Sequence, residues 1–280
     1  MHIETITSGS NSKIKNLLLL QEKSKARREQ GLFVVEGKRE LEHCIEAGYK
    51  VHTVFVCPEI AGAEAFSGAF ARTGSRSDAE ERASAPAIVE VPEHLYRKIA
   101  YREGTEGIVA EVETRTIGLE DLQLPENPLI VVLEAVEKPG NLGAVLRSAD
   151  AAGADAVIVC DPLTDLYNPN LIRASIGAIF TVPTVTAGSA EVIAFLKARG
   201  IRILTAQLQD SSLYYDVDMK CGTAIIMGTE STGLTDIWRR AADAHIRISM
   251  LGRLDSLNVS VSASILLYEA VRQRQNNYNQ

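Results

Sequence analysis

The second half of the chain contains four short, almost wholly apolar runs, which restrict the fold more than any other feature of the sequence. Each has the length of a β-strand, and stretches with helical spacing separate them. Strands that are apolar throughout and alternate with helices indicate a parallel sheet covered on both faces. The runs occupy 129–133, 156–160, 201–206 and 223–228, and the helical stretches occupy 142–152, 170–178 and 189–199. The sequence therefore predicts a doubly wound α/β domain in this half.

The first half has the pattern of a smaller α/β unit. Short strands are predicted at 33–37, 51–56, 87–91 and 107–113, and helices at 38–48, near 92–100 and from Ser12, which can cap its helix. Residues 59–86 carry the weakest pattern and are expected to form helix fragments and a mobile loop. A polar stretch with prolines then suggests a linker. The predicted domains are 1–113 and 127–280, joined by the linker 114–126.

Charge is unevenly distributed along the chain. The net charge is −7, which argues against coating nucleic acid by bulk electrostatics, yet the segment 11–39 carries +5. Such a run is either the solvated face of a helix or a surface that contacts phosphates, and both interpretations stay open. The basic residues considered for RNA binding are Lys13, Lys15, Lys23, Lys25, Arg27, Arg28 and Arg39.

Several classes of protein are disfavoured by composition. The 280 residues are 46% hydrophobic, which is ample for a buried core and excludes a disordered chain. The four cysteines are scattered, with no paired spacing and no histidine at zinc spacing, so no metal site is expected. No apolar run approaches the ~18 residues of a membrane span, and the first residues lack the apolar core of a signal peptide. A cytoplasmic protein that contacts no membrane is expected.

Three segments of the second half are candidates for chemistry. The first, PGNLGAVLRSADAAGAD (139–155), follows a strand; its apolar residues form one helical face that excludes Arg147, and Asn141 stands where an N-cap belongs. The second, MGTESTGL (227–234), is a glycine-bracketed turn that also follows a strand. It lacks the Lys and Ser/Thr of a phosphate-binding P-loop, but open α/β sheets bind ligands at such turns. The third is IRISMLGRLDSLNVSVSASILLYEAVRQ (246–273), within which a helix is expected to begin near Leu257.

Each segment also has a purely structural interpretation. The first is then a capped helix with an Arg147–Asp150 surface pair, the second a tight polar turn, and the third the start of a terminal amphipathic helix. A dinucleotide-binding oxidoreductase is disfavoured, because the chain lacks the G-x-G-x-x-G fingerprint and its acidic ribose partner.

Together and in this order, the three segments resemble the signature of the SpoU (TrmH-type) branch of the SPOUT RNA methyltransferases. The family patterns N-x-G-A-x-x-R-[ST]-A, G-x-E-x-x-G and I-P-M-x-G-x-x-x-S-L-N-V-S are matched by NLGAVLRSA, GTESTG and ISMLGRLDSLNVS. The chain departs from the family at Ser249, where proline is usual, and at Glu137–Lys138, where Asp-Pro is common. We expect a slightly altered cofactor loop and retained activity.

The resemblance implies a trefoil-knotted α/β catalytic domain that acts as a homodimer and uses S-adenosylmethionine to methylate a ribose 2′-hydroxyl of structured RNA, with ribosomal RNA favoured over tRNA. Residues 3–113 look like the family's substrate-binding domain, an α/β sandwich like that of certain ribosomal proteins. The other function class left open is an RNA-binding module that keeps the fold without turnover.

The resemblance also assigns residues. Arg147 has the central role, either as the base or as a guanidinium that grips a phosphate and stabilises the alkoxide, and no metal is required. The cofactor is expected to be held largely by backbone. The orienting residues are Asn141, Glu230, Ser256 and Asn258, and the cofactor-binding residues are Thr205, Ala206, Gly228, Ile248, Met250, Leu257 and Asn258.

Overall fold

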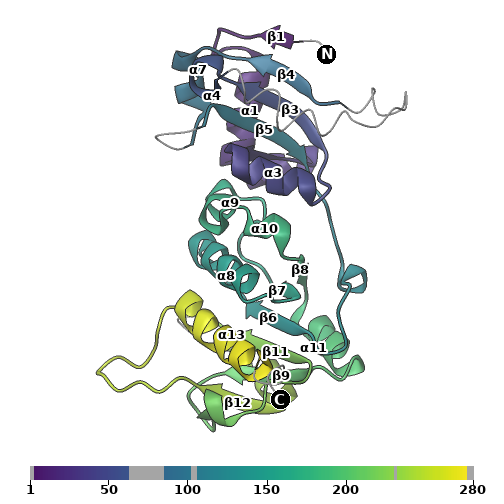
Figure 1. Cartoon of the computed structure of the whole chain (residues 1–280), viewed down its shortest axis with the longest axis vertical. Helices are drawn as coiled ribbons and strands as arrows, with labels where there is room; N and C mark the ends of the chain where they lie inside the picture. The colour runs from purple at the N-terminus through teal and green to yellow at the C-terminus, as the bar shows by residue number, and fades with distance from the viewer. Residues whose placement is uncertain (1–2, 63–84, 102–105, 230–231, 276–280) are drawn as a thin grey trace. The chain divides into compact units, whose positions relative to one another are not determined.

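The computed structural model describes residues 3–62, 85–101, 106–229 and 232–275. Its contacts group the chain into two compact units (Figure 1). Unit 1 contains residues 1–115 and 166–177, and unit 2 contains 116–165 and 178–280. The segment 166–177 thus belongs with the first unit, although it lies between two strands of the second. Within the described residues, no helix is both long and apolar enough to cross a bilayer.

Unit 1 is built on a five-stranded mixed sheet of order β1-β4-β3-β5-β2. The pairs β1–β4 and β3–β4 are parallel, whereas β5 runs antiparallel to both β2 and β3. The apolar sides of α1 and α7 fill the core against this sheet, with Leu17, Leu20, Phe55 and Tyr96 inaccessible to solvent. The strands are β1 (Ile3–Thr5), β2 (Leu32–Glu36), β3 (Val51–Val56), β4 (Ala87–Glu90) and β5 (Ile108–Glu113). The helices are α1 (Ser12–Glu22), α2 (Ser24–Gln30), α3 (Lys38–Glu46), α4 (Pro58–Ala61), α7 (Glu93–Ile99) and α9 (Pro169–Ser175).

The segment 166–177 is attached to the rest of unit 1 by an aromatic cluster. The ring of Tyr167 stacks on Phe33 with centroids 4.3 Å apart and meets Tyr49 edge-on. The Tyr167 hydroxyl also accepts a hydrogen bond from the backbone N–H of Arg115 at 2.9 Å. Burial raises the pKa of the Tyr167 hydroxyl above its ordinary value. This hydroxyl therefore stays protonated and available for hydrogen bonding at neutral pH.

Unit 2 is built on a seven-stranded sheet of order β10-β12-β9-β11-β6-β7-β8, in which every pair is parallel. The strands are β6 (Leu129–Glu134), β7 (Ala156–Cys160), β8 (Thr184–Ala187), β9 (Arg202–Ala206), β10 (Ser212–Leu213), β11 (Thr223–Met227) and β12 (Ala244–Arg247). The direction of winding changes between β6 and β11. In an open parallel sheet, the crevice at such a point lies outside the carboxyl ends of the strands and is the usual place for a ligand.

Helices cover both faces of this sheet. On one face, α11 and α12 bury Val192, Leu196 and Trp238 against β6, β9 and β11. The other face is covered by α8 and α13, which pack closely enough for the hydroxyls of Ser148 and Ser264 to lie 2.7 Å apart. The helices are α8 (Pro139–Ala151), α10 (Ala178–Thr181), α11 (Ser189–Ala198), α12 (Asp236–Ala241) and α13 (Val259–Gln275), with 3-10 turns at Leu119–Asp121 and Tyr214–Asp216.

The end of α13 is tied to the beginnings of two central strands. Arg274 donates hydrogen bonds to the backbone carbonyls of Asn127, Pro128, Met219 and Cys221. These residues precede β6 and β11, so the last described helix is anchored at the amino ends of these strands, opposite to the end where ligands bind. This anchoring leaves the start of α13 at the carboxyl ends.

The doubly wound parallel sheet is confirmed, and the four apolar runs all form strands within one residue of their predicted bounds at each end. Short strands with fewer apolar residues, such as β1, β8 and β12, were not predicted. Residues 119 and 122, expected in the linker, are buried in the core of unit 2. Of the expected helix fragments and loop at 59–86, residues 63–84 lie outside the described part of the chain.

Two predicted helix caps are wrong. The cap of α1 is Asn11 instead of Ser12, because the Asn11 side chain accepts from the N–H of Lys13 at 2.8 Å. In α8, Pro139 occupies the first turn and Asn141 lies inside the helix. The Asn141 side chain accepts a hydrogen bond from Asn258.

Candidate active site

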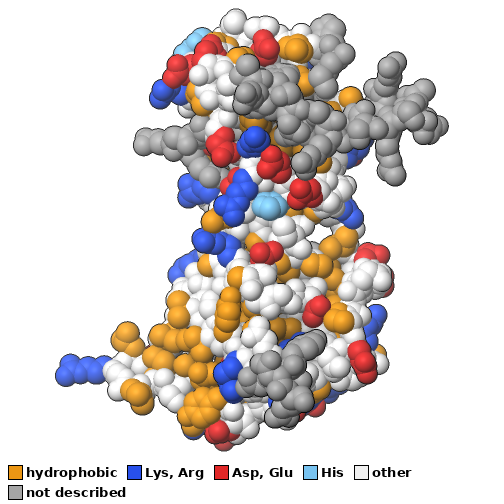
Figure 2. Space-filling model, viewed as in Figure 1, with side chains coloured by type: hydrophobic (Ala, Val, Ile, Leu, Met, Phe, Trp, Pro, Cys, Tyr) orange, Lys and Arg blue, Asp and Glu red, His pale blue; other side chains and the backbone are white. Residues whose placement is uncertain are grey.

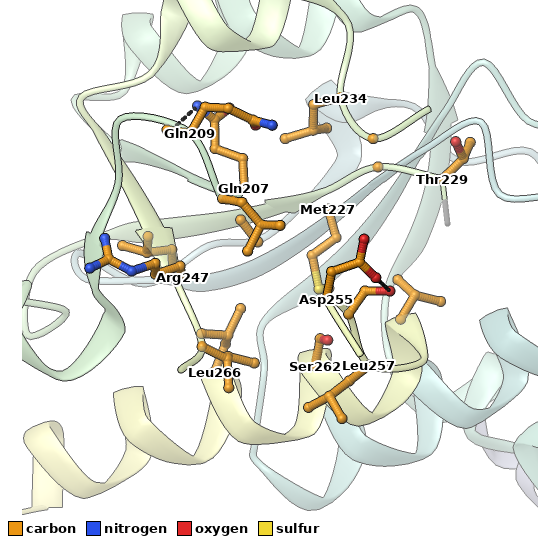
Figure 3. A pocket seen from close by; sticks show the side chains of 18 of the residues that line it. Gln207, Gln209, Met227, Thr229, Leu234, Arg247, Asp255, Leu257, Ser262 and Leu266 are labelled. Carbon is orange, nitrogen blue, oxygen red and sulfur yellow. Dashed lines mark hydrogen bonds between the residues drawn. The ribbon is translucent and has the colours of Figure 1, made fainter. Parts of the chain in front are cut away.

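A pocket of about 360 Å³ opens at the carboxyl ends of β9, β11 and β12 (Figure 3). Its walls come from the loops that follow these strands and from the beginning of α13. Met227, Leu234, Ile246 and Leu266 supply apolar surface. Polar groups come from Gln207, Gln209, Arg239, Arg247 and Asp255. A pocket with apolar walls and a few convergent polar groups suits a small ligand that is part apolar and part charged.

The turn after β11 brings two stretches of backbone very close together. A Cβ atom on Gly228 would lie 2.3 Å from the carbonyl carbon and oxygen of Gly233, so no other residue fits there without moving the backbone. The turn is closed by the N–H of Gly233, which donates to the Thr229 carbonyl at 3.1 Å. Gly233 itself has a φ of +68°, a conformation that favours glycine. Both glycines of the GTESTG motif are therefore required by the backbone path.

A buried carboxylate holds the far end of this turn. Glu134, at the end of β6, accepts hydrogen bonds from the N–H of Thr235 at 2.8 Å and from its hydroxyl at 2.6 Å. The indole N–H of Trp238 donates to Ser189, whose hydroxyl also faces Glu134. These bonds join the central strand to the start of α12, which fixes the position of the pocket wall.

Five of the residues expected to bind the cofactor line the pocket: Ala206, Gly228, Ile248, Met250 and Leu257. Thr205 does not line it. Side chains alternate along β9, so Thr205 lies on the other side from Ala206, where its hydroxyl is hydrogen-bonded to Nδ1 of His245 at 2.6 Å. Thr205 supports the neighbouring strand β12 instead.

A smaller pocket of about 120 Å³ adjoins the first at the point where the winding direction changes. It is lined from the ends of β6 and β11 and from the start of α8, including Ala135, Lys138 and Asn141. Gly228 and Thr229 line both pockets, so the two spaces share a wall.

The first and third motifs meet beside this smaller pocket. The side-chain amide of Asn258 donates to Oδ1 of Asn141 at 3.1 Å, although the two residues are 117 positions apart. The Asn258 oxygen accepts from the N–H of Ser260 at 2.9 Å, which fixes the orientation of its amide. Asn258 thus orients Asn141 and is not among the residues that line the larger pocket.

The remaining predicted catalytic residues have different environments. Ser256 lines the larger pocket, next to Asp255. Arg147 is exposed on α8 and lines neither pocket, and within the described residues it makes no hydrogen bond or ion pair. The alternative Arg147–Asp150 pair is thus not formed, and Asp150 instead accepts a hydrogen bond from Thr181. Glu230 lies outside the described residues.

The basic residues of unit 1 are not equivalent. Arg27 is 3% exposed, and its guanidinium donates to the carbonyls of Leu20 at 2.6 Å and Gln21 at 3.2 Å. The prediction that Arg27 contacts RNA is therefore wrong. Arg27 instead supplies hydrogen-bond donors to carbonyl groups in the last turn of α1 and so joins α1 to α2. Lys13 is exposed and paired with Glu4. The others predicted to bind RNA are exposed on the surface of unit 1, and they are Lys15, Lys23, Lys25, Arg28 and Arg39.

Several pocket residues were missed from the sequence. Gln207 and Gln209 directly follow β9, and their position after a buried strand was the available signal. Arg239 lies on the short helix α12, where a surface position was the simpler interpretation. In the described ranges, no group of three or more His, Cys, Asp or Glu side chains is placed to hold a metal ion.

The pocket lies within the part of the chain that matches a known protein family. Residues 128–268 match the SpoU rRNA Methylase family, and residues 11–110 match an MRM3-like substrate binding domain. This chain belongs to the SpoU rRNA methylase family. The family's described activity and the resemblance of the three motifs agree, so the chain is an RNA methyltransferase with S-adenosylmethionine as its methyl donor.

Several known proteins are similar to this chain over most of its length. The chain is 32% identical over 251 residues to the 23S rRNA (uridine(2479)-2'-O)-methyltransferase of Streptomyces viridochromogenes, an alignment that covers 87% of this chain and 84% of that protein. An AdoMet-bound rRNA methyltransferase from Sinorhizobium meliloti has a TM-score of 0.85 and 30% identity, with 96% and 98% of the two chains covered. A crystallised RNA 2'-O ribose methyltransferase has a TM-score of 0.80 and 38% identity, covering 97% and 99%.

Proposed function

We propose that this protein methylates a ribose 2′-hydroxyl in ribosomal RNA, with the cofactor in the larger pocket and the target ribose in the smaller one. The observation that carries the proposal is the wall shared by the two pockets at Gly228 and Thr229. Pockets that share lining residues adjoin, so a donor in one and an acceptor in the other can be brought into contact where the two spaces meet. The rRNA 2′-O-methyltransferases among the relatives support the choice of RNA.

The larger pocket fits S-adenosylmethionine. Its apolar surface suits the adenine ring, and its charged side chains suit the amino-acid end. When bound, S-adenosylmethionine supplies a methyl group on a positively charged sulfur. The methyl group would pass to the ribose oxygen, S-adenosylhomocysteine would leave, and the hydroxyl proton would pass to solvent. The protein has to hold the hydroxyl in line with that methyl group and to favour the developing alkoxide.

The start of α8 is suited to hold the target nucleotide. Asn141 and Lys138 line the smaller pocket. The Asn141 amide is suited to hydrogen bonds with ribose hydroxyls, and the Lys138 ammonium to a phosphate. The first N–H groups of a helix add a partial positive charge at that place. We assign Asn141 and Asn258 to orienting the ribose, and Ser256 and Glu230 to orienting the cofactor.

Arg147 is proposed to stabilise the reacting oxygen and to grip the adjacent phosphate. A guanidinium stays protonated in proteins, so stabilisation of charge fits its chemistry better than proton abstraction. Its exposure, and the lack of a partner among the described residues, leave it available for RNA. Because Arg147 lines neither pocket in a single chain, its entry into the reaction centre needs either movement or a second subunit.

We further propose that the protein acts as a homodimer through the surface of α8 and α13. Exposed apolar side chains gather on α13 and on the loop before it (Figure 2). Leu251 is 98% exposed, Leu254 75%, Tyr268 51% and Val261 46%. Apolar surface of this kind is typical of protein interfaces. Arg147 shares its side of α8 with Ala151, whose carbonyl accepts from the Tyr268 hydroxyl, so Arg147 borders this surface.

The proposal also includes a knotted chain path and the domain division 1–113, 114–126 and 127–280, in which Leu119 and Leu122 of the connecting segment pack into the core of unit 2. The family resemblance supports the knot, and the anchoring of α13 by Arg274 supports a C-terminal helix held between distant parts of the chain. Unit 1 is proposed to bind RNA through its exposed basic residues, since its family match is a substrate-binding domain.

The decisive experiment measures methyl transfer. Ribose methylations are mapped in ribosomal RNA from cells with and without this protein, and the purified protein is then incubated with the unmethylated RNA and S-adenosylmethionine. We expect one 2′-O-methyl group to disappear in the cells and to be restored in vitro. RNA binding without any methyl transfer would instead support the RNA-binding module, and an unchanged methylation map with inactive protein would reject the enzyme.

A further inference from the structure

A buried carboxylate lies where the loops that line the two pockets separate. The ladder between β6 and β11 ends at the pair Leu133–Met227. Beyond that pair the strands lead into different loops, since residues 135–138 line the smaller pocket, whereas Gly228 and Thr229 line both. Glu134 is the last residue of β6 and is buried. Its carboxylate is therefore placed to hold the two loops together past the end of the ladder.

Both carboxylate oxygens of Glu134 bind Thr235. Oε2 accepts from the Thr235 N–H at 2.8 Å, and Oε1 accepts from its hydroxyl at 2.6 Å. Thr235 is the N-cap residue of α12, where a threonine hydroxyl usually accepts from the helix backbone, but among the described residues it makes no such bond. Leu234, next to it, lines the larger pocket (Figure 3). The two bonds to Thr235 thus fix a wall of that pocket at the expense of a local helix cap.

The backbone turns sharply directly after Glu134. Ala135 has a φ of +52°, in the left-handed region, which strains the backbone of a residue that carries a Cβ atom. Such a conformation persists only where the surroundings fix it, and it occurs preferentially at functional sites. The Ala135 N–H donates to the Cys160 carbonyl at 2.9 Å, which holds the turn against β7. Ala135 itself lines the smaller pocket, so the strained corner leads directly into that pocket.

We infer that Glu134 is a positioning residue for methyl transfer, whose contact with Thr235 aligns the wall of the larger pocket with the loop that lines the smaller one. The inference rests on the proposed function, and it adds a residue outside the three sequence motifs. Glu134 lines neither pocket, so it acts through the two loops. A displacement of about 1 Å between reacting groups can cost roughly 100-fold in rate, so a small loss of alignment is measurable.

The test separates the chemical step from cofactor binding. Thr235→Val removes the hydroxyl donor from an exposed residue, so the variant is expected to fold. Single-turnover methylation of ribosomal RNA from cells that lack the protein should slow by about tenfold or more. The Kd for S-adenosylhomocysteine, measured by titration of the full chain, should stay within about threefold of wild type. Thr235→Ser keeps the hydroxyl and should restore most of the rate.

A second variant tests the carboxylate itself. Glu134→Gln has the same shape but no charge, which weakens both bonds to Thr235, so it should slow methyl transfer at least as much as Thr235→Val. The double variant should be no slower than the slower single variant, because both substitutions disrupt the same contact. Multiplied effects in the double variant would show that Glu134 acts without Thr235 and would overturn the inference.

Thr223→Val is the matched control. Thr223 lies at the amino end of β11, away from both pockets, and its buried hydroxyl donates to the Cys221 carbonyl at 2.8 Å. This variant should be less stable than wild type but should transfer methyl groups at the wild-type rate at temperatures where it is folded.

Equal rates for Thr235→Val and wild type would overturn the inference, whether or not Glu134→Gln folds. A fall of rate and cofactor affinity by the same factor in Thr235→Val would make the contact structural only and would also overturn it. If the wild type neither bound S-adenosylhomocysteine nor methylated the RNA, the proposed function would fail together with the inference, and that failure is recognised without any variant.

Discussion

The larger pocket of unit 2, which we propose holds the cofactor, and the basic surface of unit 1 are built in opposite ways. The pocket takes its walls from three strand ends and a helix start that are spread from Ala206 to Leu266. The basic surface comes largely from one continuous segment, α1 and α2, and consists of side chains. A pocket of this kind depends on the whole sheet, whereas a charged surface depends on each side chain separately. Substitutions in the pocket should therefore change cofactor binding, and substitutions in the basic surface should change RNA binding, each without the other.

The largest expected effect is on the chemical step. Arg147→Ala should lower the rate of methyl transfer by about 10²–10³, because a positioned donor to developing charge is removed. Affinity for S-adenosylmethionine should stay within twofold of wild type, since Arg147 lines neither pocket. Single-turnover kinetics and titration measure the two quantities. Lys197→Ala, an exposed cation on α11, is the control, and near-normal turnover in Arg147→Ala would remove Arg147 from the mechanism.

The next effect is on the pocket itself. Gly228→Ala should weaken S-adenosylmethionine binding by about 10–100-fold, because the new methyl group would overlap the backbone of Gly233 and move the turn. Gly252→Ala is the matched control, since a Cβ at Gly252 meets nothing within 4 Å. Titration with S-adenosylhomocysteine measures both. RNA affinity should be unchanged in Gly252→Ala and should fall less than cofactor affinity in Gly228→Ala, because Gly228 also lines the smaller pocket. Equal cofactor affinity in the two variants would contradict the role of the close backbone contact.

A third change separates assembly from chemistry. Val261→Glu places a charge on the exposed apolar surface of α13 and should convert a dimer into a monomer, with methyl transfer reduced by at least about tenfold. Sedimentation and turnover are measured at one protein concentration. Leu163→Glu, at another exposed apolar position, should leave both unchanged. A fully active monomer would show that Arg147 completes the site without a partner.

The smallest effect is expected in unit 1. Replacing Lys23, Lys25 and Arg28 by glutamine should weaken RNA binding and flatten its salt dependence by about 0.7–0.9 in log–log slope for each phosphate that is no longer neutralised. Cofactor affinity should not change. The ion pair of Lys25 with Glu29, at 3.7 Å, is too exposed to compete strongly with a phosphate. Binding lines that superimpose across a salt series would instead identify these residues as a solvated helix face.

Arg27→Gln provides a contrasting variant within the same segment. The buried Arg27 guanidinium donates hydrogen bonds to two backbone carbonyls. Its replacement should therefore lower the free energy of unfolding by about 1.5–3 kcal/mol. The salt slope of RNA binding should stay at the wild-type value. Chemical denaturation and the same salt series measure the two effects, and a changed slope would return Arg27 to the RNA-binding surface.

The sequence predicted those parts of the site that depend on local pattern. The buried strands followed from apolar runs such as 129–133 and 156–160, and the exposure of Arg147 followed from helical spacing. The glycines of the GTESTG turn were found because a tight turn after a strand needs them. Gln207 was not found, since a glutamine after a strand looks the same whether it faces water or a pocket.

What the sequence determined by itself was therefore the alternation of strands and helices, the family signature and the uneven charge. Periodicity and short motifs involve only a few neighbouring residues, so they can be recognised from the sequence alone. Only the tertiary structure decided that Thr205 faces His245, that Arg27 is buried, and that Asn258 bonds to Asn141 across 117 positions. The physical reason is that each of these depends on which distant backbone or side chain becomes the hydrogen-bond partner, and that is established only when the sheet and its covering helices pack.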